Sequence, residues 1–140
     1  MDTIFGQASD RRAERAAELK KSGAANCCQA VVEAFADLLP GMDPAALHRL
    51  GAGFAVGMGT MEATCGALVG AGLVAGLLAD GNAKAVKLAR GTFEGFRDKC
   101  GATVCGDLKG RNGGPVLCEC EDCCRNAVRA LEETLAQSKK

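Results

Sequence analysis

The sequence predicts an all-α protein, a single-domain helical bundle of about four main helices plus short helices, from three observations. Apolar residues recur at helical spacing along most of the chain, and no strand-like alternation persists. Gly, Pro and Asn residues fall between the periodic segments, where helices stop and start. A chain of 140 residues with 48% hydrophobic content can bury one core without disulfides. We expect an N-terminal tail over residues 1–9 and one cysteine-rich domain over residues 10–140.

Three helices are expected in the first part of the chain. A charged, Ala-rich surface helix covers residues 10–21, and the Ser-Gly pair that follows ends it. Asn26 has the side chain of an N-cap for a second helix through Leu39, which a Pro-Gly pair ends. An Asp-Pro pair is typical of a helix start and predicts a short third helix from Pro44 to about Leu50.

A glycine-rich loop over residues 51–59 precedes the most apolar segment of the chain. That segment, residues 63–79, is uncharged and belongs to a helix that we expect to begin near residues 60–62. It reaches only the lower length limit of a membrane-spanning helix, and acidic residues bound it, so we expect a buried helix and no membrane partner. Glycines four residues apart suit close helix packing. They are Gly66 with Gly70, and Gly72 with Gly76.

Two long helices complete the predicted bundle. The first covers residues 83–97, and its expected inward stripe comprises Val86, Ala89, Phe93 and Phe96. Residues 100–114 are expected to be irregular, apart from a short helical turn near residues 105–109. The last helix runs from about residue 122 to residue 137, with Glu132 and Glu133 on a solvated face. Its expected apolar stripe comprises Cys124, Val128, Leu131 and Leu135.

Nine cysteines are the feature of this sequence that bears most on function. The N-terminal residues are polar and lack the apolar stretch of a secretion signal, so we expect a cytoplasmic protein in a reducing compartment. Cysteines there stay as thiols, bind metal or cycle between thiol and disulfide, and an odd number does not suit a fully paired scaffold. The nine are Cys27, Cys28, Cys65, Cys100, Cys105, Cys118, Cys120, Cys123 and Cys124.

Composition argues against several other functions. The 17 basic and 17 acidic residues cancel, and Trp and Tyr are absent, so we expect no nucleic-acid partner. The single histidine, His48, lies on a short helix among leucines and is a weak candidate for a catalytic base. The Gly-Ala-Gly motif at residues 51–53 lacks the third glycine and the preceding strand of a dinucleotide-binding motif.

Four cysteines are predicted in the first turn of a helix, on or beside its apolar face. They are Cys27, Cys65, Cys105 and Cys124. The partial positive charge of a helix N-terminus stabilises thiolate over thiol and lowers a cysteine pKa. Convergence of the four helix starts at one end of the bundle would build a reactive thiol cluster. We predict Cys65 as the nucleophile, because it starts the most buried helix, and the other three as resolving thiols or metal co-ligands.

Segments around the same four cysteines resemble a known family. Residues 65–70, Cys-Gly-Ala-Leu-Val-Gly, match a Cys-Gly-Ala-x-x-Gly core, and residues 26–31 look like the cysteine segment that precedes it. Residues 105–110 and Cys124, with an apolar residue four positions on, look like the third and fourth segments. In this order they resemble the redox-active protein family C_GCAxxG_C_C over about residues 10–137. The resemblance implies an all-α redox protein, whose partner is another redox protein or is associated with a transporter.

The chain has five cysteines beyond that four-cysteine pattern, and four of the five are candidate metal ligands. Three stand in the run Cys-Glu-Cys-Glu-Asp-Cys-Cys, and the candidates are Cys118, Cys120, Cys123 and Cys100. Thiolates about 3.5–4 Å apart can share a zinc ion or an iron–sulfur cluster. The acidic neighbours raise the cost of bare thiolate charge unless a cation is present. The spacing is that of neither a zinc finger nor a ferredoxin, and a flexible loop with redundant cysteines is an equal alternative.

Three functions therefore stay open from the sequence. The first is a thiol-based redox protein, of which a thiol-disulfide oxidoreductase is one kind, that cycles disulfides or transfers electrons to a partner. The second is a metal or iron–sulfur carrier that uses the cysteine-rich segment 100–124. The third is a non-catalytic structural adaptor, in which the Gly-rich helix packs against a partner or against a second copy in a homodimer.

Overall fold

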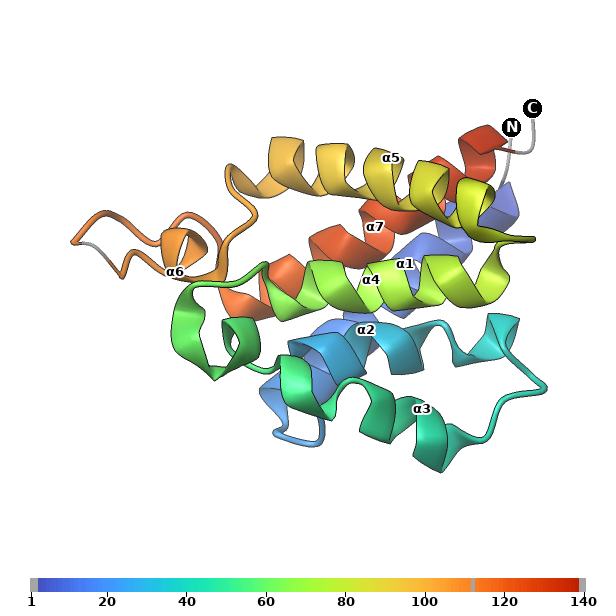
Figure 1. Ribbon diagram of the computed structural model, residues 1–140, viewed down its shortest axis with the longest axis horizontal. Helices are drawn as coiled ribbons and strands as arrows, with labels where there is room; N and C mark the ends of the chain where they lie inside the picture. The colour runs from blue at the N-terminus through green and yellow to red at the C-terminus, as the bar shows by residue number, and fades with distance from the viewer. Residues whose placement is uncertain (1–2, 112, 139–140) are drawn as a thin grey trace.

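The computed structural model describes residues 3–111 and 113–138, and over them the protein is all-α, as the sequence predicts (Figure 1). No strand forms in this part of the chain, where the only β-type contact is an isolated antiparallel bridge between Thr64 and Val104. The α-helices are α1 (Thr3–Lys21), α2 (Cys27–Ala34), α3 (Pro44–Leu50), α4 (Gly66–Leu78), α5 (Asn82–Cys100), α6 (Cys105–Leu108) and α7 (Cys120–Ser138). Shorter helical turns lie at Ala36–Leu38, Ala52–Phe54 and Gly57–Met61.

Three of the four long helices, α1, α4 and α7, pack around the shorter α2, and the fourth, α5, packs on α4 and α7. α1 packs along α7, and α4 packs against both α2 and α5. α2 contacts α1, α4 and α7, and six of its eight residues are buried. The helix predicted through Leu39 ends as an α-helix at Ala34 and continues as the turn Ala36–Leu38. The centre of the fold is therefore α2, whose first residue is Cys27.

Two helix starts differ from the prediction. α1 begins at Thr3, inside the segment expected to be a tail. α4 begins at Gly66 rather than near residues 60–62, because the chain turns at Met61, whose φ is 63°, and then forms the bridge at Thr64. Thr64 precedes Cys65, so this bridge places Cys65 at the start of the helix and not inside it.

α4 lies so close to α2 and to the turn Ala52–Phe54 that two of its positions have no room for a side chain. A Cβ at Gly66 would lie 2.6 Å from the Phe54 carbonyl oxygen, and a Cβ at Gly70 would lie 2.7 Å from the Cys28 carbonyl oxygen. Gly72, by contrast, faces open space. Of the two expected glycine pairs, only Gly66 and Gly70 therefore support packing within this chain. None of the helices in the described residues has the length and apolarity to cross a membrane.

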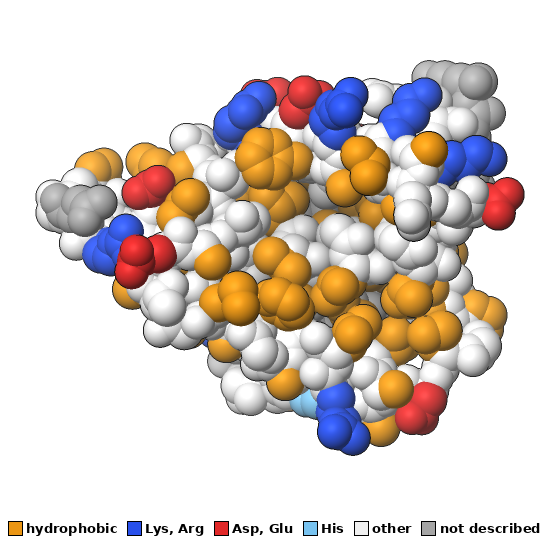
Figure 2. Space-filling model, in the orientation of Figure 1, with side chains coloured by type: hydrophobic (Ala, Val, Ile, Leu, Met, Phe, Trp, Pro, Cys, Tyr) orange, Lys and Arg blue, Asp and Glu red, His pale blue; other side chains and the backbone are white. Residues whose placement is uncertain are grey.

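The predicted inward stripe of α5 is wrong at two positions. Val86 is 58% exposed and Phe93 is 37% exposed, whereas Leu88, Thr92 and Phe96 are buried. α7 packs on this face at two glycines of α5, where a Cβ would meet Thr134 at 2.8 Å and Ala130 at 3.3 Å. The pattern of apolar residues misses this face because glycine, which makes the approach possible, does not count as apolar. Figure 2 shows hydrophobic side chains gathered across the middle of one face of the molecule, and lysines and arginines along the α5 edge.

Glu132 also contradicts its predicted place on a solvated face. It is 1% exposed, and the Arg12 guanidinium donates to its carboxylate at 2.6 Å. Arg12 also donates to Asp37 at 2.9 Å and lies over the Phe35 ring, so one cation ties α1 to α7 and to the end of α2. Glu133 is exposed, as expected. The apolar stripe of α7 is confirmed, since all four of its predicted residues are buried.

The approach of α4 to α2 gives a test of the fold. Gly70→Ala is expected to lower the free energy of unfolding by roughly 1–3 kcal/mol, because the new methyl group meets backbone that cannot move aside. Gly72→Ala is the matched control on the same helix, where alanine is favoured over glycine by up to about 1 kcal/mol. Urea unfolding followed by circular dichroism measures both changes. Equal destabilisation by the two variants would contradict the close approach.

Candidate functional site: a thiol-lined cavity

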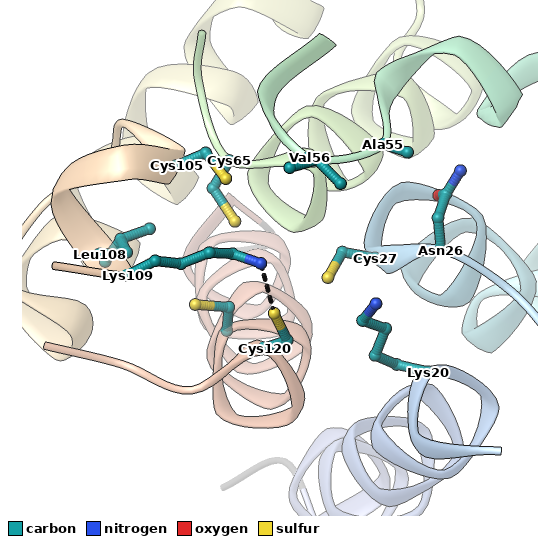
Figure 3. Close-up of a pocket in the computed structure, with 12 residues that line it drawn as sticks. Lys20, Asn26, Cys27, Ala55, Val56, Cys65, Cys105, Leu108, Lys109 and Cys120 are labelled. Carbon is teal, nitrogen blue, oxygen red and sulfur yellow. Dashed lines mark hydrogen bonds between the residues drawn. The ribbon is translucent and has the colours of Figure 1, made fainter. Parts of the chain in front are cut away.

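A cavity of about 70 Å³ lies where the ends of several helices meet, and thiols dominate its wall (Figure 3). Five of the nine cysteines line it: Cys27, Cys65, Cys105, Cys120 and Cys123. They come from α2, from the start of α4, from α6 and from α7, so segments far apart in the sequence contribute. Lys20 and Lys109 line the same cavity and bring two ammonium groups to it.

The starts of the helices explain how three of these thiols come together. Asn26 caps α2 through a capping box with Gln29, and Cys27 follows as the first helical residue. Cys65 donates its backbone N–H to the Thr103 carbonyl at 2.8 Å. Cys105 donates its own N–H to the Ala63 carbonyl at 3.0 Å. The antiparallel bridge between these two segments therefore places Cys65 and Cys105 on the same wall.

Cys65 is the thiol of the cavity whose setting favours thiolate. The Cys123 thiol interacts with its sulfur and lowers the pKa of Cys65, and the backbone N–H groups of Ala67 and Leu68 lower it further. Burial acts in the opposite direction but does not outweigh them. The orientation of α4 thus supplies two unpaired N–H donors to one sulfur.

The expected lowering of the pKa does not extend to Cys27 and Cys105. The contact with Cys120 lowers the pKa of Cys27, but the contact with Cys124 and burial together raise it well above its ordinary range. Burial raises the pKa of Cys105, and the charge of Lys109 offsets only part of that rise. A position at a helix start therefore does not lower the pKa of a cysteine whose sulfur is buried among other thiols.

Cys124, the fourth predicted helix-start thiol, does not line the cavity. α7 begins at Cys120, so Cys124 lies in the second turn of the helix and not in the first. It is fully buried, and its sulfur lies 4.0 Å from the Cys27 carbonyl oxygen, behind the cavity wall. The structure thus brings three of the four predicted catalytic cysteines to the cavity, together with Cys120 and Cys123.

Lys109 is a site residue that the sequence analysis missed. Its ammonium donates to the Cys120 sulfur at 2.8 Å, as Figure 3 shows. Burial lowers the pKa of Lys109, but the Cys120 contact and the neighbouring thiols more than compensate, so its pKa is raised. The available signal was its position four residues after Cys105, which places both side chains on one face of a helical turn.

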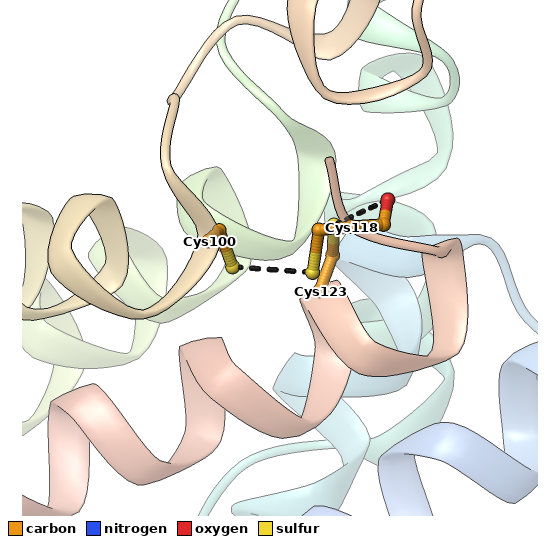
Figure 4. A group of neighbouring side chains, drawn as sticks. All are labelled: Cys100, Cys118 and Cys123. Atoms are coloured by element: carbon orange, nitrogen blue, oxygen red, sulfur yellow. Dashed lines mark hydrogen bonds between the residues drawn. The ribbon is translucent and has the colours of Figure 1, made fainter. Parts of the chain in front are cut away.

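A second group of thiols lies beside the cavity (Figure 4). The sulfur atoms of Cys100, Cys118 and Cys123 all lie within 4.8 Å of one another, and all three residues are buried. The Cys118 thiol donates to the Cys100 sulfur at 3.4 Å, and the Asn126 side chain donates to the same sulfur at 3.3 Å. Contacts with Cys123, Asn126 and Cys118 lower the pKa of Cys100 to about 6, against the effect of burial.

This trio contains three of the four predicted metal ligands. Cys120 is not among them, because its sulfur pairs with Lys109 at the cavity. Cys123 belongs to both groups, since it lines the cavity and contacts the buried pair. Cys28 belongs to neither, and burial raises its pKa to about 12. His48 pairs with Glu33 at 2.6 Å and does not line the cavity.

The opposite pKa shifts of two cavity thiols can be measured directly. At pH 7, Cys65 of the reduced protein is expected to react with iodoacetamide faster than Cys105, because only thiolate reacts. As the pH falls from 9 to about 5, labelling of Cys65 should persist below the range where an ordinary thiol, with a pKa near 8.5, stops reacting. Mass spectrometry of the labelled peptides gives both rates. Faster labelling of Cys105 at any pH in this range contradicts the assignment.

Comparison with known proteins places the chain in a family. Residues 25–134 match the sequence model of a family described as putative redox-active protein (C_GCAxxG_C_C). Searches of curated proteins and of solved structures give no match. The matched range includes all nine cysteines and therefore the cavity thiols and the buried trio. This protein therefore belongs to the C_GCAxxG_C_C family, which is described as redox-active.

Proposed function

We propose that the protein is a thiol–disulfide redox protein that exchanges two electrons with a disulfide presented by a partner, in a reducing compartment such as the cytoplasm. The observation that carries the proposal is the presence of Cys65 and Cys123 together on the wall of the thiol-lined cavity, where the Cys123 thiol lowers the pKa of Cys65. A cavity of about 70 Å³ admits only a small group, so the partner offers a disulfide that protrudes from its own surface. The two lysines of the cavity favour the negative charge that develops on a departing sulfur.

The exchange has two steps. The Cys65 thiolate attacks one sulfur of the partner disulfide, forms a mixed disulfide and releases the other partner sulfur as a thiolate. Cys123 passes its proton to that thiolate and attacks the Cys65 sulfur, which releases the second partner sulfur, protonated from solvent. The products are a Cys65–Cys123 disulfide and a reduced partner dithiol. The reduction potentials of the two couples decide the direction of net transfer.

The other helix-start thiols keep supporting roles in this proposal. Cys120 and Cys27 line the same cavity wall, and Cys27 raises the pKa of Cys120, so these two form a second candidate pair. Cys105 is a resolving thiol for a mixed disulfide that bypasses Cys123, because it lines the cavity with Cys65. Cys124 acts through Cys27, whose backbone and thiol it contacts from behind the wall.

Trapping the mixed disulfide tests the exchange. Reduced Cys123→Ser protein, treated with a short peptide that carries one internal disulfide, is expected to accumulate the peptide on Cys65, because the resolving thiol is missing. Cys65→Ser should slow peptide reduction by about 100-fold, since the remaining cavity thiols have raised pKa values. Cys28→Ser, outside the cavity, is the matched control and should behave as the wild type. Wild-type rates in Cys65→Ser would contradict the proposal.

A metal site is the second candidate function, and the trio of Cys100, Cys118 and Cys123 favours it. Three thiolates suit zinc or one corner of a cluster, with a fourth position for another ligand. Tetrahedral zinc with bonds of about 2.3 Å holds its sulfur ligands about 3.8 Å apart. The Cys100 and Cys118 sulfurs of the trio lie 3.4 Å apart, which is closer than that spacing. The trio would have to rearrange around zinc, which is why we rank this function second.

Metal analysis of anaerobically purified protein separates the two functions. A metal protein is expected to carry about one zinc per chain, or iron with sulfide, and Cys118→Ser should lose most of it. Cys120→Ser is the control, because Cys120 faces Lys109 and not the trio. A metal content far below one per chain in the wild type, with all thiols titratable, contradicts the metal function.

A further inference from the structure

We propose that Cys100 and Cys118 form a second, internal redox couple, and that Cys123 passes oxidising equivalents to it from the cavity. The inference rests on the proposed function, since it takes the Cys65–Cys123 disulfide as its starting point. Neither Cys100 nor Cys118 has a place in the exchange with the partner described above. The proposal gives both of them a role in the same chemistry.

The first support is a continuous chain of sulfur contacts. Cys123 lines the cavity together with Cys65, and its sulfur also lies within 4.8 Å of the sulfurs of Cys100 and Cys118. The Cys100 and Cys118 sulfur atoms lie 3.4 Å apart. Thiol–disulfide exchange needs each attacking sulfur next to the sulfur that it attacks. The arrangement of these thiols from the cavity wall to Cys118 suits that requirement.

The second support is position, which leaves Cys123 as the route of access. All four of these thiols are buried, but only Cys65 and Cys123 line the cavity, whereas Cys100 and Cys118 do not. A disulfide carried by a partner therefore reaches Cys65 and Cys123 but not this pair. Oxidising equivalents that reach Cys100 and Cys118 have to pass through Cys123, the member of the trio that lines the cavity.

The third support is the local structure, which holds the pair together and lets it close. Asn126 donates to the Cys100 sulfur at 3.3 Å and to the Cys118 sulfur at 3.8 Å, so one amide positions both. Cys100 is the last residue of α5, and Cys118 lies in the segment before α7. A disulfide bond is about 2.05 Å long, so the two sulfurs have to approach by a little over 1 Å. Residues at a helix end and in a loop accommodate such a shift.

The internal transfer is balanced without any external reagent. The Cys100 thiolate attacks the Cys123 sulfur of the Cys65–Cys123 disulfide, and Cys65 leaves as a thiolate. Cys118 gives its proton to the cavity thiols and attacks the Cys100 sulfur of the new Cys100–Cys123 bond, which releases Cys123. One disulfide breaks and one forms, and the Cys65–Cys123 dithiol is restored. The chain then reduces a second partner disulfide before it needs a reductant.

Disulfide mapping over time tests the relay. Reduced, metal-free protein is mixed with excess of the same disulfide peptide, quenched with acid and alkylated, and mapped by mass spectrometry. In the wild type, the Cys65–Cys123 disulfide should appear first and the Cys100–Cys118 disulfide should follow. In Cys65→Ser, formation of Cys100–Cys118 should slow at least about tenfold, because its route of entry is blocked. In Cys118→Ser, the first phase should keep its rate and the second should vanish.

Two further variants keep the test decisive if one of the others folds poorly. Asn126→Ala should slow only the second phase, because it loosens the pair without touching the cavity. Cys28→Ser is the matched control and should show both phases.

A wild type that forms only the Cys65–Cys123 disulfide overturns the relay but keeps the proposed function. Formation of Cys100–Cys118 at an undiminished rate in Cys65→Ser, or zinc held by the trio, also overturns the relay. No reaction at Cys65 at all contradicts the proposed function itself.

Discussion

The contact between α2 and α4 is the constraint on which the rest of the site depends. Backbone meets backbone at Gly70, where a methyl group would overlap the Cys28 carbonyl oxygen of α2, and Gly66 packs in the same way on the Phe54 carbonyl oxygen of the neighbouring turn. This approach brings the first residue of α2 beside the first turn of α4, and so Cys27 beside Cys65 on one cavity wall. A larger residue at either glycine would separate the two helix starts before it disturbed any thiol chemistry. The small residues of the Cys-Gly-Ala-x-x-Gly motif therefore position sulfur atoms as much as they pack the core.

Burial and hydrogen bonding compete at every thiol of the site, and their balance differs from one sulfur to the next. Burial raises the pKa of Cys105, while N–H donors and the Cys123 thiol lower that of Cys65. The same competition lowers the pKa of Cys100, which does not line the cavity. Two sulfurs thus favour thiolate in a group whose other members stay protonated. Such a division suits stepwise exchange, because each transfer needs one thiolate and one proton donor.

Much of the fold follows from local sequence, whereas the composition of the site depends on tertiary contacts. The short helix from Pro44 to Leu50 and the apolar stripe of α7 are as predicted, because caps and 3.6-residue periodicity are local properties. The buried face of α5 and the burial of Glu132 are not, since they depend on glycines and on Arg12 from another helix. The cavity also contains Cys123 in place of the predicted Cys124. Because α7 starts two residues earlier than predicted, Cys120 and Cys123 lie in its first turn at the cavity, and Cys124 lies in the second turn.

The positions of Cys100 and Cys118 along the chain have a consequence for stability. The 17 residues between them, from 101 to 117, include all of α6, and with it Cys105 and Lys109 of the cavity wall. A bond between the two sulfurs would close this segment into a ring, and a ring of that size removes roughly 3 kcal/mol of chain entropy from the unfolded state. Oxidation of the pair would therefore stabilise the cavity wall, and reduction of the pair would remove that stabilisation. Resistance of residues 101–117 to proteolysis would then report the redox state of a buried pair of sulfurs.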